Sequence, residues 1–326
     1  MPHKTQTADK VARDLRPAPT SRRRLAWTSR LLIVLVPCAM ALLGWFAMDR
    51  AGSLAPRGSG WYLLLAFTAL QASILCFAVR LHFSLRAFGI DLSARAASII
   101  ALQSLFYFFI PLSIGTDAAR WLKIRNRIPD ISRMTVLTAV LFDRGTAAVA
   151  CVVIAASTLP LIPSIRIDIA TVGELASSWW VAILAFLAGA ALVTMFQVAR
   201  RRFPNLLPLT FQRRFLLNMV ACLGLSLLTQ GFMILTVWSG LQWLGVLIKP
   251  AAISLGVTGA AIAQVIPLSV AGAGPGEVTA GVLLTRTGAS TDEAVLVATL
   301  VYFCKLIGGI EGGLLEWPPI SRRLHA

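Results

Sequence analysis

The chain has 326 residues, of which 57% are hydrophobic and only 13% are charged, whereas an ordinary soluble domain carries about 25% charged residues. Its mean hydropathy is +0.77. These values exclude a soluble enzyme and a receptor with one span and a folded ectodomain. The formal net charge of +16 comes from bases in short segments between apolar runs, so membrane topology explains it better than nucleic-acid binding does.

The uncharged runs along the chain predict an all-α polytopic membrane protein. They cover residues 31–48, 61–79, 96–116, 175–199, 215–248 and 250–276. Several are long enough to cross a hydrocarbon core, which takes about 20 helical residues. The runs are continuously apolar and not apolar at every second position, so a lipid-facing β-barrel is not expected.

The ends of the chain predict its domain organisation. Roughly 30 hydrophilic residues precede the first apolar run, more than a signal peptide carries there, so this run is expected to be a retained signal anchor. We expect residues 1–27 to form a disordered basic cytoplasmic tail and residues 28–318 to form a single membrane domain. Residues 319–326 are then a second cytoplasmic tail.

The distribution of Lys and Arg predicts the side of each loop, because these residues gather on the cytoplasmic side. Four basic stretches and the C-terminal arginines are assigned to the cytoplasm: residues 1–30, 80–95, 120–133 and 200–214, with Arg322 and Arg323. Arg80 is counted here as a loop residue. The segments with few bases are assigned to the outside: residues 49–60, 158–178, 239–250 and 286–293.

Two apolar segments are predicted to enter and leave on one side of the membrane. Both ends of 96–116 are cytoplasmic, so this run is either a re-entrant helical hairpin or a pair of short spans, and Pro111 and Gly115 allow it to turn. A second broken segment lies between 250 and 286, with both ends outside. The prediction is about six full spans and two broken hairpins, with both termini cytoplasmic, in the inner or plasma membrane.

An internal repeat is predicted from two matching stretches. Residues 110–115 read Ile-Pro-Leu-Ser-Ile-Gly and residues 266–271 read Ile-Pro-Leu-Ser-Val-Ala, an offset of 266 − 110 = 156. The third spans also match, with Phe142-Asp143-Arg144 against Phe303-Cys304-Lys305. Three full crossings per copy would invert the second copy, so we expect an inverted-topology repeat with halves at about 28–157 and 179–316.

The second break contains three alternating glycines, Gly272, Gly274 and Gly276, followed by Glu277. Glycine allows close approach of the backbone, and Pro275 suits the first position of a helix. In broken transporter helices the free N–H groups of a half-helix can hold an anionic group. The alternative is a simple turn in which Glu277 satisfies the unpaired donors at the helix start, and Glu277 could do both.

The first break is followed by a basic stripe, because Arg120, Lys123 and Arg127 recur on one helical face. This stripe would contact either anionic cytoplasmic lipid or a substrate. Asp117 would cap the helix or pair with Arg120 one turn away.

Four charged residues, Asp143, Arg144, Lys305 and Glu311, interrupt apolar spans, where an unpaired charge costs several kcal/mol. Asp143 and Arg144 point about 100° apart on a helix, so each needs a partner elsewhere. One interpretation is a structural ion-pair network that holds the two repeats together. The other is a cationic phosphate site, in which Arg144 makes bidentate contacts and Lys305 acts as a point charge.

The spacing of the cysteines and histidines predicts no functional site. The cysteines lie singly in apolar runs and are expected to be small core residues: Cys38, Cys76, Cys151, Cys222 and Cys304. The three histidines are scattered at His3, His82 and His325. Neither a disulfide framework nor a metal site nor a cofactor is therefore expected.

Together these motifs resemble the lysylphosphatidylglycerol synthase transmembrane region, or flippase-like, family. The resemblance rests on the turn at 110–115 with Asp117 and Arg120, on Phe142-Asp143-Arg144, and on the glycine-rich turn before Glu277, and it covers residues 28–318. It implies a protein that moves lipids, in isoprenoid, hopanoid or glycolipid pathways. Candidate substrate-binding residues are Asp117, Arg120, Asp143, Arg144, Gly272, Gly274, Gly276, Glu277 and Lys305.

The sequence departs from the family in two respects. Members usually carry Pro-Gly-Gly-x-Gly before the glutamate, whereas residues 272–276 read Gly-Ala-Gly-Pro-Gly. The 326 residues also leave no room beside the membrane domain for the soluble acetyltransferase-like domain that performs aminoacyl transfer in bifunctional members, so we do not expect lysyl transfer.

Three functions remain open at this point. The leading hypothesis is a translocator for an anionic, polyprenyl- or isoprenoid-linked membrane lipid, without catalysis or nucleotide hydrolysis of its own. The alternatives are a membrane-embedded, lipid-linked glycosyltransferase and a non-transporting membrane subunit of a lipid-modifying enzyme. A lipid-modifying enzyme or a glycosyltransferase is the candidate protein partner.

Overall fold

The computed structural model describes residues 58–109, 115–162, 213–264 and 273–316, and three isolated positions, Leu42, Phe46 and Asp49. Within these ranges the chain forms eight α-helices, two short 3-10 helices and no strand. Four helices are long and apolar enough to cross a membrane: α3 (Gly60–Ala87), α6 (Arg133–Thr158), α10 (Arg213–Leu244) and α13 (Thr291–Glu316). The prediction of an all-α membrane protein is confirmed.

These four helices correspond to four of the six predicted spans. The predicted spans at 31–48 and 179–199 lie outside the described residues, as do the tails at 1–27 and 319–326. The matching stretches at 110–115 and 266–271 also lie outside them, except for Gly115. One boundary is wrong: the run that was expected to leave the membrane at residue 79 continues as helix α3 to Ala87.

The two predicted broken segments each form a pair of short helices. The first pair is α4 (Ala94–Leu105), extended by the 3-10 helix η1 (Phe106–Phe109), and α5 (Gly115–Arg127). The second pair is α11 (Pro250–Ala263) and α12 (Pro275–Arg286). A further 3-10 helix, η2 (Leu159–Leu161), follows α6. Both halves therefore have the same order of one long, two short and one long helix.

The ends of the helices follow from local sequence. Ser59 and Ser93 accept hydrogen bonds from the backbone at the starts of α3 and α4, as N-cap residues do. Gly89 and Gly245, with φ of 72° and 76°, supply the left-handed turns that end α3 and α10. The offset between these two glycines is 245 − 89 = 156, the same as between the two Ile-Pro-Leu-Ser stretches.

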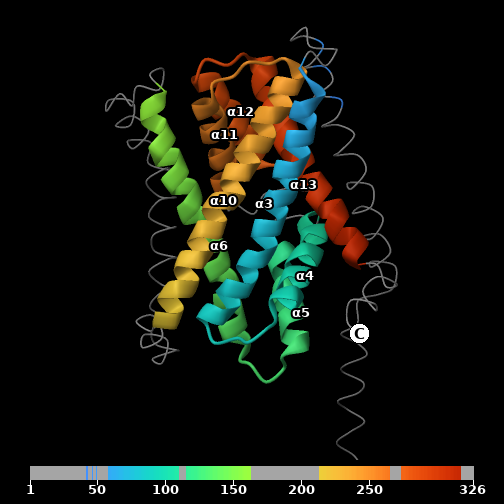
Figure 1. Ribbon diagram of the computed structural model, residues 1–326, viewed down its shortest axis with the longest axis vertical. Coiled ribbons are helices and arrows are strands. Elements are labelled where there is room, and N and C mark those ends of the chain that lie inside the picture. Colours follow the sequence, from blue (N-terminus) through green and yellow to red (C-terminus); the bar gives the residue numbers. More distant parts are fainter. Residues whose placement is uncertain are drawn as a thin grey trace, which may run out of the picture.

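The helices α3 and α10 pack side by side along their length at the centre of the molecule (Figure 1). They run antiparallel, because Gly58 N donates to Trp243 O at one end (2.9 Å) and the rings of Phe88 and Phe215 meet at the other. Between these ends, Ser73 Oγ donates to Thr229 O at 3.0 Å, and these residues are also 156 positions apart.

The two short-helix pairs lie at opposite ends of the long axis, α4 and α5 at the bottom and α11 and α12 at the top of Figure 1. Each is packed against the other half, since α4 contacts α13 and α11 contacts α6. The contact between α4 and α13 is close, because a Cβ at Gly312 would collide with the carbonyl oxygen of Leu102. One buried apolar cluster includes Leu81, Ile100 and Val140, and the other includes Leu241, Ile253 and Val297.

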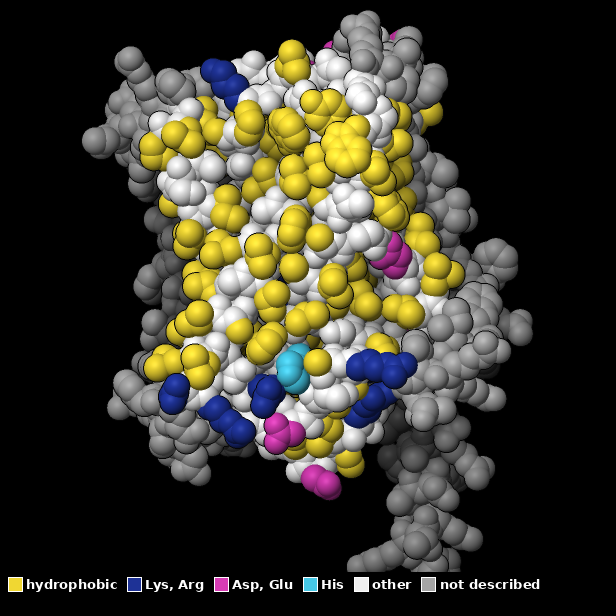
Figure 2. Space-filling view, viewed as in Figure 1, with side chains coloured by type: hydrophobic (Ala, Val, Ile, Leu, Met, Phe, Trp, Pro, Cys, Tyr) yellow, Lys and Arg dark blue, Asp and Glu magenta, His cyan; other side chains and the backbone are white. Residues whose placement is uncertain are grey.

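The surface of the molecule fits a membrane environment. On the face drawn in Figure 2, apolar side chains cover most of the height and basic side chains gather at the lower end. Large apolar residues are exposed along α3 and α10, among them Phe67, Leu75 and Leu217. Such a continuous exposed apolar surface is stable in lipid and would be an aggregation site in water.

Candidate functional site

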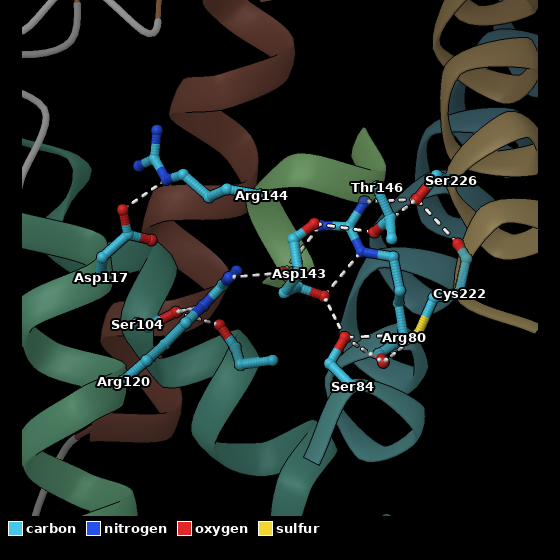
Figure 3. A network of polar contacts seen from close by, with 11 residues as sticks. Arg80, Ser84, Ser104, Asp117, Arg120, Asp143, Arg144, Thr146, Cys222 and Ser226 are labelled. Carbon is cyan, nitrogen blue, oxygen red and sulfur yellow. Dashed lines mark hydrogen bonds and ion pairs between the residues drawn. The ribbon is translucent and has the colours of Figure 1, made fainter. Parts of the chain in front are cut away.

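The carboxylate of Asp143, in the middle of α6, is completely buried and is shared by two arginines (Figure 3). Arg80 of α3 donates from Nε to Oδ1 at 2.8 Å and from Nη2 to Oδ2 at 2.9 Å. Arg120 of α5 donates from Nη1 to Oδ2, also at 2.9 Å. The Arg80 contact is bidentate, the strongest geometry for a guanidinium and a carboxylate.

This network extends into neighbouring helices through hydroxyl groups. Ser84 Oγ donates to Oδ1 of Asp143 at 3.0 Å, and Arg120 Nε donates to Ser104 Oγ of α4 at 3.0 Å. Arg80 Nη1 reaches Ser226 Oγ of α10, in the second half of the chain, at 3.1 Å. The arrangement therefore favours the structural interpretation for Asp143 and Arg120, because their hydrogen bonds join α3, α4, α5 and α6, and Arg80 extends the network to α10.

The buried network carries an excess positive charge, since two guanidiniums share one carboxylate and arginine keeps its charge in proteins. Part of this charge lies over an aromatic face. The guanidinium carbon of Arg120 lies 4.5 Å from the centre of the Phe77 ring, and that of Arg80 lies 5.6 Å from it. Cation–π attraction of this kind strengthens when the cation is desolvated.

Arg144 follows Asp143 in α6 but belongs to a different ion pair. In Figure 3 its side chain is turned away from Asp143, and its Nε pairs with Oδ2 of Asp117 in the first turn of α5. The expectation that Asp143 and Arg144 need separate partners is confirmed. The suggested pairing of Asp117 with Arg120 is wrong, because Arg120 points into the buried network and leaves Asp117 to Arg144.

Glu277 and Lys305 form the corresponding pair in the second half. Oε1 of Glu277 accepts from Lys305 Nζ of α13, and Oε2 accepts from the backbone N–H of Gly274 at 2.8 Å. The side chains are 8% and 13% exposed, respectively. Glu277 therefore satisfies a donor at the helix start, which is one of its two predicted roles, and it also neutralises an intramembrane cation.

The glycine-rich turn contributes close packing at one position. Gly276 lies against α11, where a Cβ would come within 2.9 Å of the carbonyl oxygen of Ala260. Gly274 has a φ of 171°, an extended conformation open to any residue, so a substitution there meets no backbone strain. Gly272 lies outside the described residues.

The two acid–base pairs occupy matching places in the two halves. Asp117 is the third residue of α5 and Glu277 the third residue of α12. Their partners, Arg144 and Lys305, end the matching tripeptides of α6 and α13. Each intramembrane cation is thus held by a carboxylate of its own half.

The predicted basic stripe on α5 does not form one continuous exposed face. Arg120 is buried, whereas Arg127 is exposed. Between them Lys123 donates to both carboxylate oxygens of Glu316, at 2.8 and 2.6 Å, and Tyr107 also donates to Glu316 at 3.0 Å. The stripe expectation fails because the helix packs against α4 and α6, which buries the face that carries Arg120.

A cavity of about 240 Å³ lies between the two halves. Its walls come from α3, α4 and η1 of the first half and from α10, α11 and α13 of the second. They are mostly apolar, and the polar side chains among them include Gln230, Gln264 and Lys305. Lys305 Nζ lies 5.9 Å from the centre of the Phe108 ring. Lys305 is the one charged side chain in the lining of this cavity as the described residues define it.

The remaining polar and sulfur-containing residues have local roles. Glu311 accepts a hydrogen bond from Gln71 Nε2 of α3 at 2.6 Å. Cys151, Cys222 and Cys304 are buried, as expected of core residues, Cys76 is partly buried, and Cys38 lies outside the described residues. In the part of the chain that the structure describes, no three His, Cys, Asp or Glu side chains are grouped so that they could hold a metal ion.

The residue that sequence analysis missed is Arg80. It was placed in a cytoplasmic loop because it ends an uncharged run, yet it is 3% exposed inside α3. Two signals in the sequence point to this position. The segment after Arg80 stays largely apolar as far as Gly89, a typical helix stop, and Arg80 and Ser84 are four residues apart and so share one helical face.

The fold and these pairs define a polytopic α-helical membrane protein with paired charges inside its membrane region. The chain belongs to the lysylphosphatidylglycerol synthase transmembrane region family, whose model matches residues 27–310. This family places the protein in membrane lipid metabolism. No curated protein and no solved structure matches the chain.

Proposed function

We propose that the protein is a lipid translocator, which moves the head group of an anionic, polyprenyl- or isoprenoid-linked lipid between the two halves of the membrane domain. The observation that carries this proposal is the cavity between the halves, with apolar walls and the amine of Lys305 in its lining. Apolar walls suit a lipid chain, and one cation in a low-dielectric site attracts a phosphate strongly. Membership of the family supports a lipid as the ligand.

The proposed path relies on an inverted-topology repeat. The offset of 156 residues recurs at Gly89 and Gly245 and at Ser73 and Thr229, and it supports two copies that meet where α3 packs against α10. The position of the two short-helix pairs at opposite ends of the molecule supports inversion (Figure 1). In this proposal each pair opens toward one side of the membrane, and the candidate residues Asp117, Arg144, Glu277 and Lys305 line the route.

The same proposal includes six full spans, a location in the inner or plasma membrane, and cytoplasmic termini. Cysteines introduced at Ser164 and Asn205 test the topology, because the first is expected to react only from outside and the second only from the cytoplasm. Unaltered protein treated in the same way reports labelling of the native cysteines. Reaction of the two positions from the reverse sides would overturn the assignment.

Reconstitution into vesicles with a panel of labelled lipids tests the function. We expect a phosphate-bearing lipid to move between leaflets, with movement lost in Lys305→Gln and kept in Lys249→Gln, which removes an exposed lysine far from the cavity lining. Sugar transfer to a labelled lipid would instead identify a glycosyltransferase. Absence of both movement and transfer for every lipid would favour a non-transporting subunit.

A further inference from the structure

The Lys305–Glu277 pair stands between two spaces. Lys305 lines the cavity between the halves, whereas Glu277 lines a groove of about 420 Å³ between α12 and α13. A group that enters the cavity therefore meets the lysine side of the pair, and the groove leaves room for the carboxylate to turn away from it.

The carboxylate of Glu277 occupies the place on Lys305 that an anionic ligand would take. One of its oxygens is bound to the ammonium, and the other is held by the N–H of Gly274 at 2.8 Å. A phosphate oxygen in the cavity can accept from the same ammonium, which has three donors on a flexible stem. The two anions compete for one cation, because Lys305 is the charged group that the cavity offers.

Displacement would leave Glu277 without a counter-charge in a low-dielectric environment. Among the helices that the structure describes, α11 and α13 pack on α12. On α13 the titratable side chains that face Glu277 are Lys305 and Tyr302, and the residues of α11 include no titratable side chain. An isolated carboxylate in such a place becomes neutral by taking up a proton.

We propose that Lys305 and Glu277 form an exchange site for a lipid phosphodiester. The phosphate replaces the Glu277 carboxylate on the Lys305 ammonium, and the released carboxylate takes up one proton that the aqueous buffer supplies. Charge is balanced at each stage: a lysine cation with a glutamate anion becomes a lysine cation with a phosphate anion and a neutral glutamic acid. Binding of the lipid at Lys305 is thus coupled to uptake of one proton by Glu277.

The first half is not expected to exchange in this way. Arg144 and Asp117 do not line the cavity, and they lie beside the excess positive charge of Arg80 and Arg120. This inference rests on the proposed function for the nature of the ligand, but not for the proton that accompanies it.

Calorimetric titration of the purified full chain in detergent with short-chain phosphatidylglycerol tests the proposal. This probe is a phosphodiester and does not itself change protonation near neutral pH. Titrations in two buffers of different ionisation heat report the protons bound per lipid. We expect about one proton for the wild type, none for Glu277→Gln with binding retained or tighter, and binding weakened at least about tenfold in Lys305→Gln.

The controls separate charge from folding. Lys305→Arg keeps the cation and is expected to keep proton-linked binding, and Lys249→Gln is expected to match the wild type in both measurements. Unaltered proton uptake in Glu277→Gln would overturn the proposal, even if Lys305→Gln failed to fold. Wild-type affinity in a folded Lys305→Gln protein would overturn it as well.

The same measurements distinguish this inference from the proposed function. Proton-linked binding without lipid movement in vesicles would remove the translocator and leave the exchange site standing. Lipid movement by a protein that binds no proton with the probe would leave the translocator and remove the exchange.

Discussion

The polar residues around Arg144 in the first half and around Lys305 in the second occupy matching positions but are built differently. In the first half Asp143 is buried and binds two arginines from two other helices. At the matching position in the second half stands Cys304, which is buried and lines the cavity. At matching positions, the first half thus has a buried ion-pair network around Asp143, and the second half has a mostly apolar cavity beside Lys305.

This difference indicates how the two halves divide their roles. The Asp143 network has several partners per charged group, so breaking it exposes more than one buried charge at once. Lys305 has one carboxylate partner, and the space beside it can accept a ligand without disrupting a network. The network of the first half depends on Asp143, Arg80 and Arg120. Cys304, at the position that matches Asp143, carries no charge, and Lys305 beside it pairs with Glu277 alone among the described carboxylates.

The largest effect is expected from Asp143→Asn, which keeps the shape but leaves two buried guanidiniums without a counter-charge. Removing one partner of a buried ion pair costs about 3–5 kcal/mol. Melting in detergent should fall steeply, with little monodisperse protein recovered. Cys304→Ala at the matching position is the control and is expected to cost about 1 kcal/mol. Equal melting of the two variants would remove the distinction between the halves.

The next largest effect is expected from Gly276→Ala, because the added Cβ would lie 2.9 Å from the carbonyl oxygen of Ala260 in α11. Overpacking of this kind costs about 1–3 kcal/mol. Gly281→Ala on the same helix meets no atom within 4 Å and is expected to be neutral or slightly stabilising. Thermal unfolding of both variants measures the difference, and a wild-type melt for Gly276→Ala would show that α11 and α12 can separate freely.

A smaller effect on stability is expected from Arg144→Gln, because its side chain is 37% exposed and its partner Asp117 is 20% exposed. The protein should accumulate and insert, with a melting temperature closer to wild type than that of Asp143→Asn. Lipid movement should be lost, as in Lys305→Gln, if both cations serve transport. Failure of Arg144→Gln to accumulate, with rescue by Asp117→Asn, would instead identify a structural pair.

The smallest effect is expected from Ser73→Ala, which removes the hydrogen bond from α3 to Thr229 O of α10. Hydrogen bonds between membrane helices average about 0.6 kcal/mol, so the melting temperature should shift little. Ser239→Ala is a matched control, because it removes a buried hydroxyl of α10 that has no hydrogen-bond partner among the described residues. A large fall in melting temperature confined to Ser73→Ala would show that this contact between α3 and α10 contributes more stability than one hydrogen bond accounts for.

Helix identity and approximate position could be predicted because apolar run length is a local property. Ser59 and Ser93 mark helix starts, and Gly89 and Gly245 mark stops. The uncharged runs at 61–79 and 215–248 predicted most of α3 and α10. The need of Asp143 and Arg144 for separate partners was also readable, since neighbours on a helix point in different directions.

The partners themselves were decided by the tertiary structure. Asp143 binds Arg80, 63 positions away, and Lys305 binds Glu277, 28 positions away, and apolar runs of similar composition offer no signal for such pairings. Charge pairing depends on which helix faces meet, and those faces are set by close contacts such as Gly276 against Ala260. The sequence by itself determined a helical membrane protein with intramembrane charges, and packing of its helices determined which charges are buried together and which one faces the cavity.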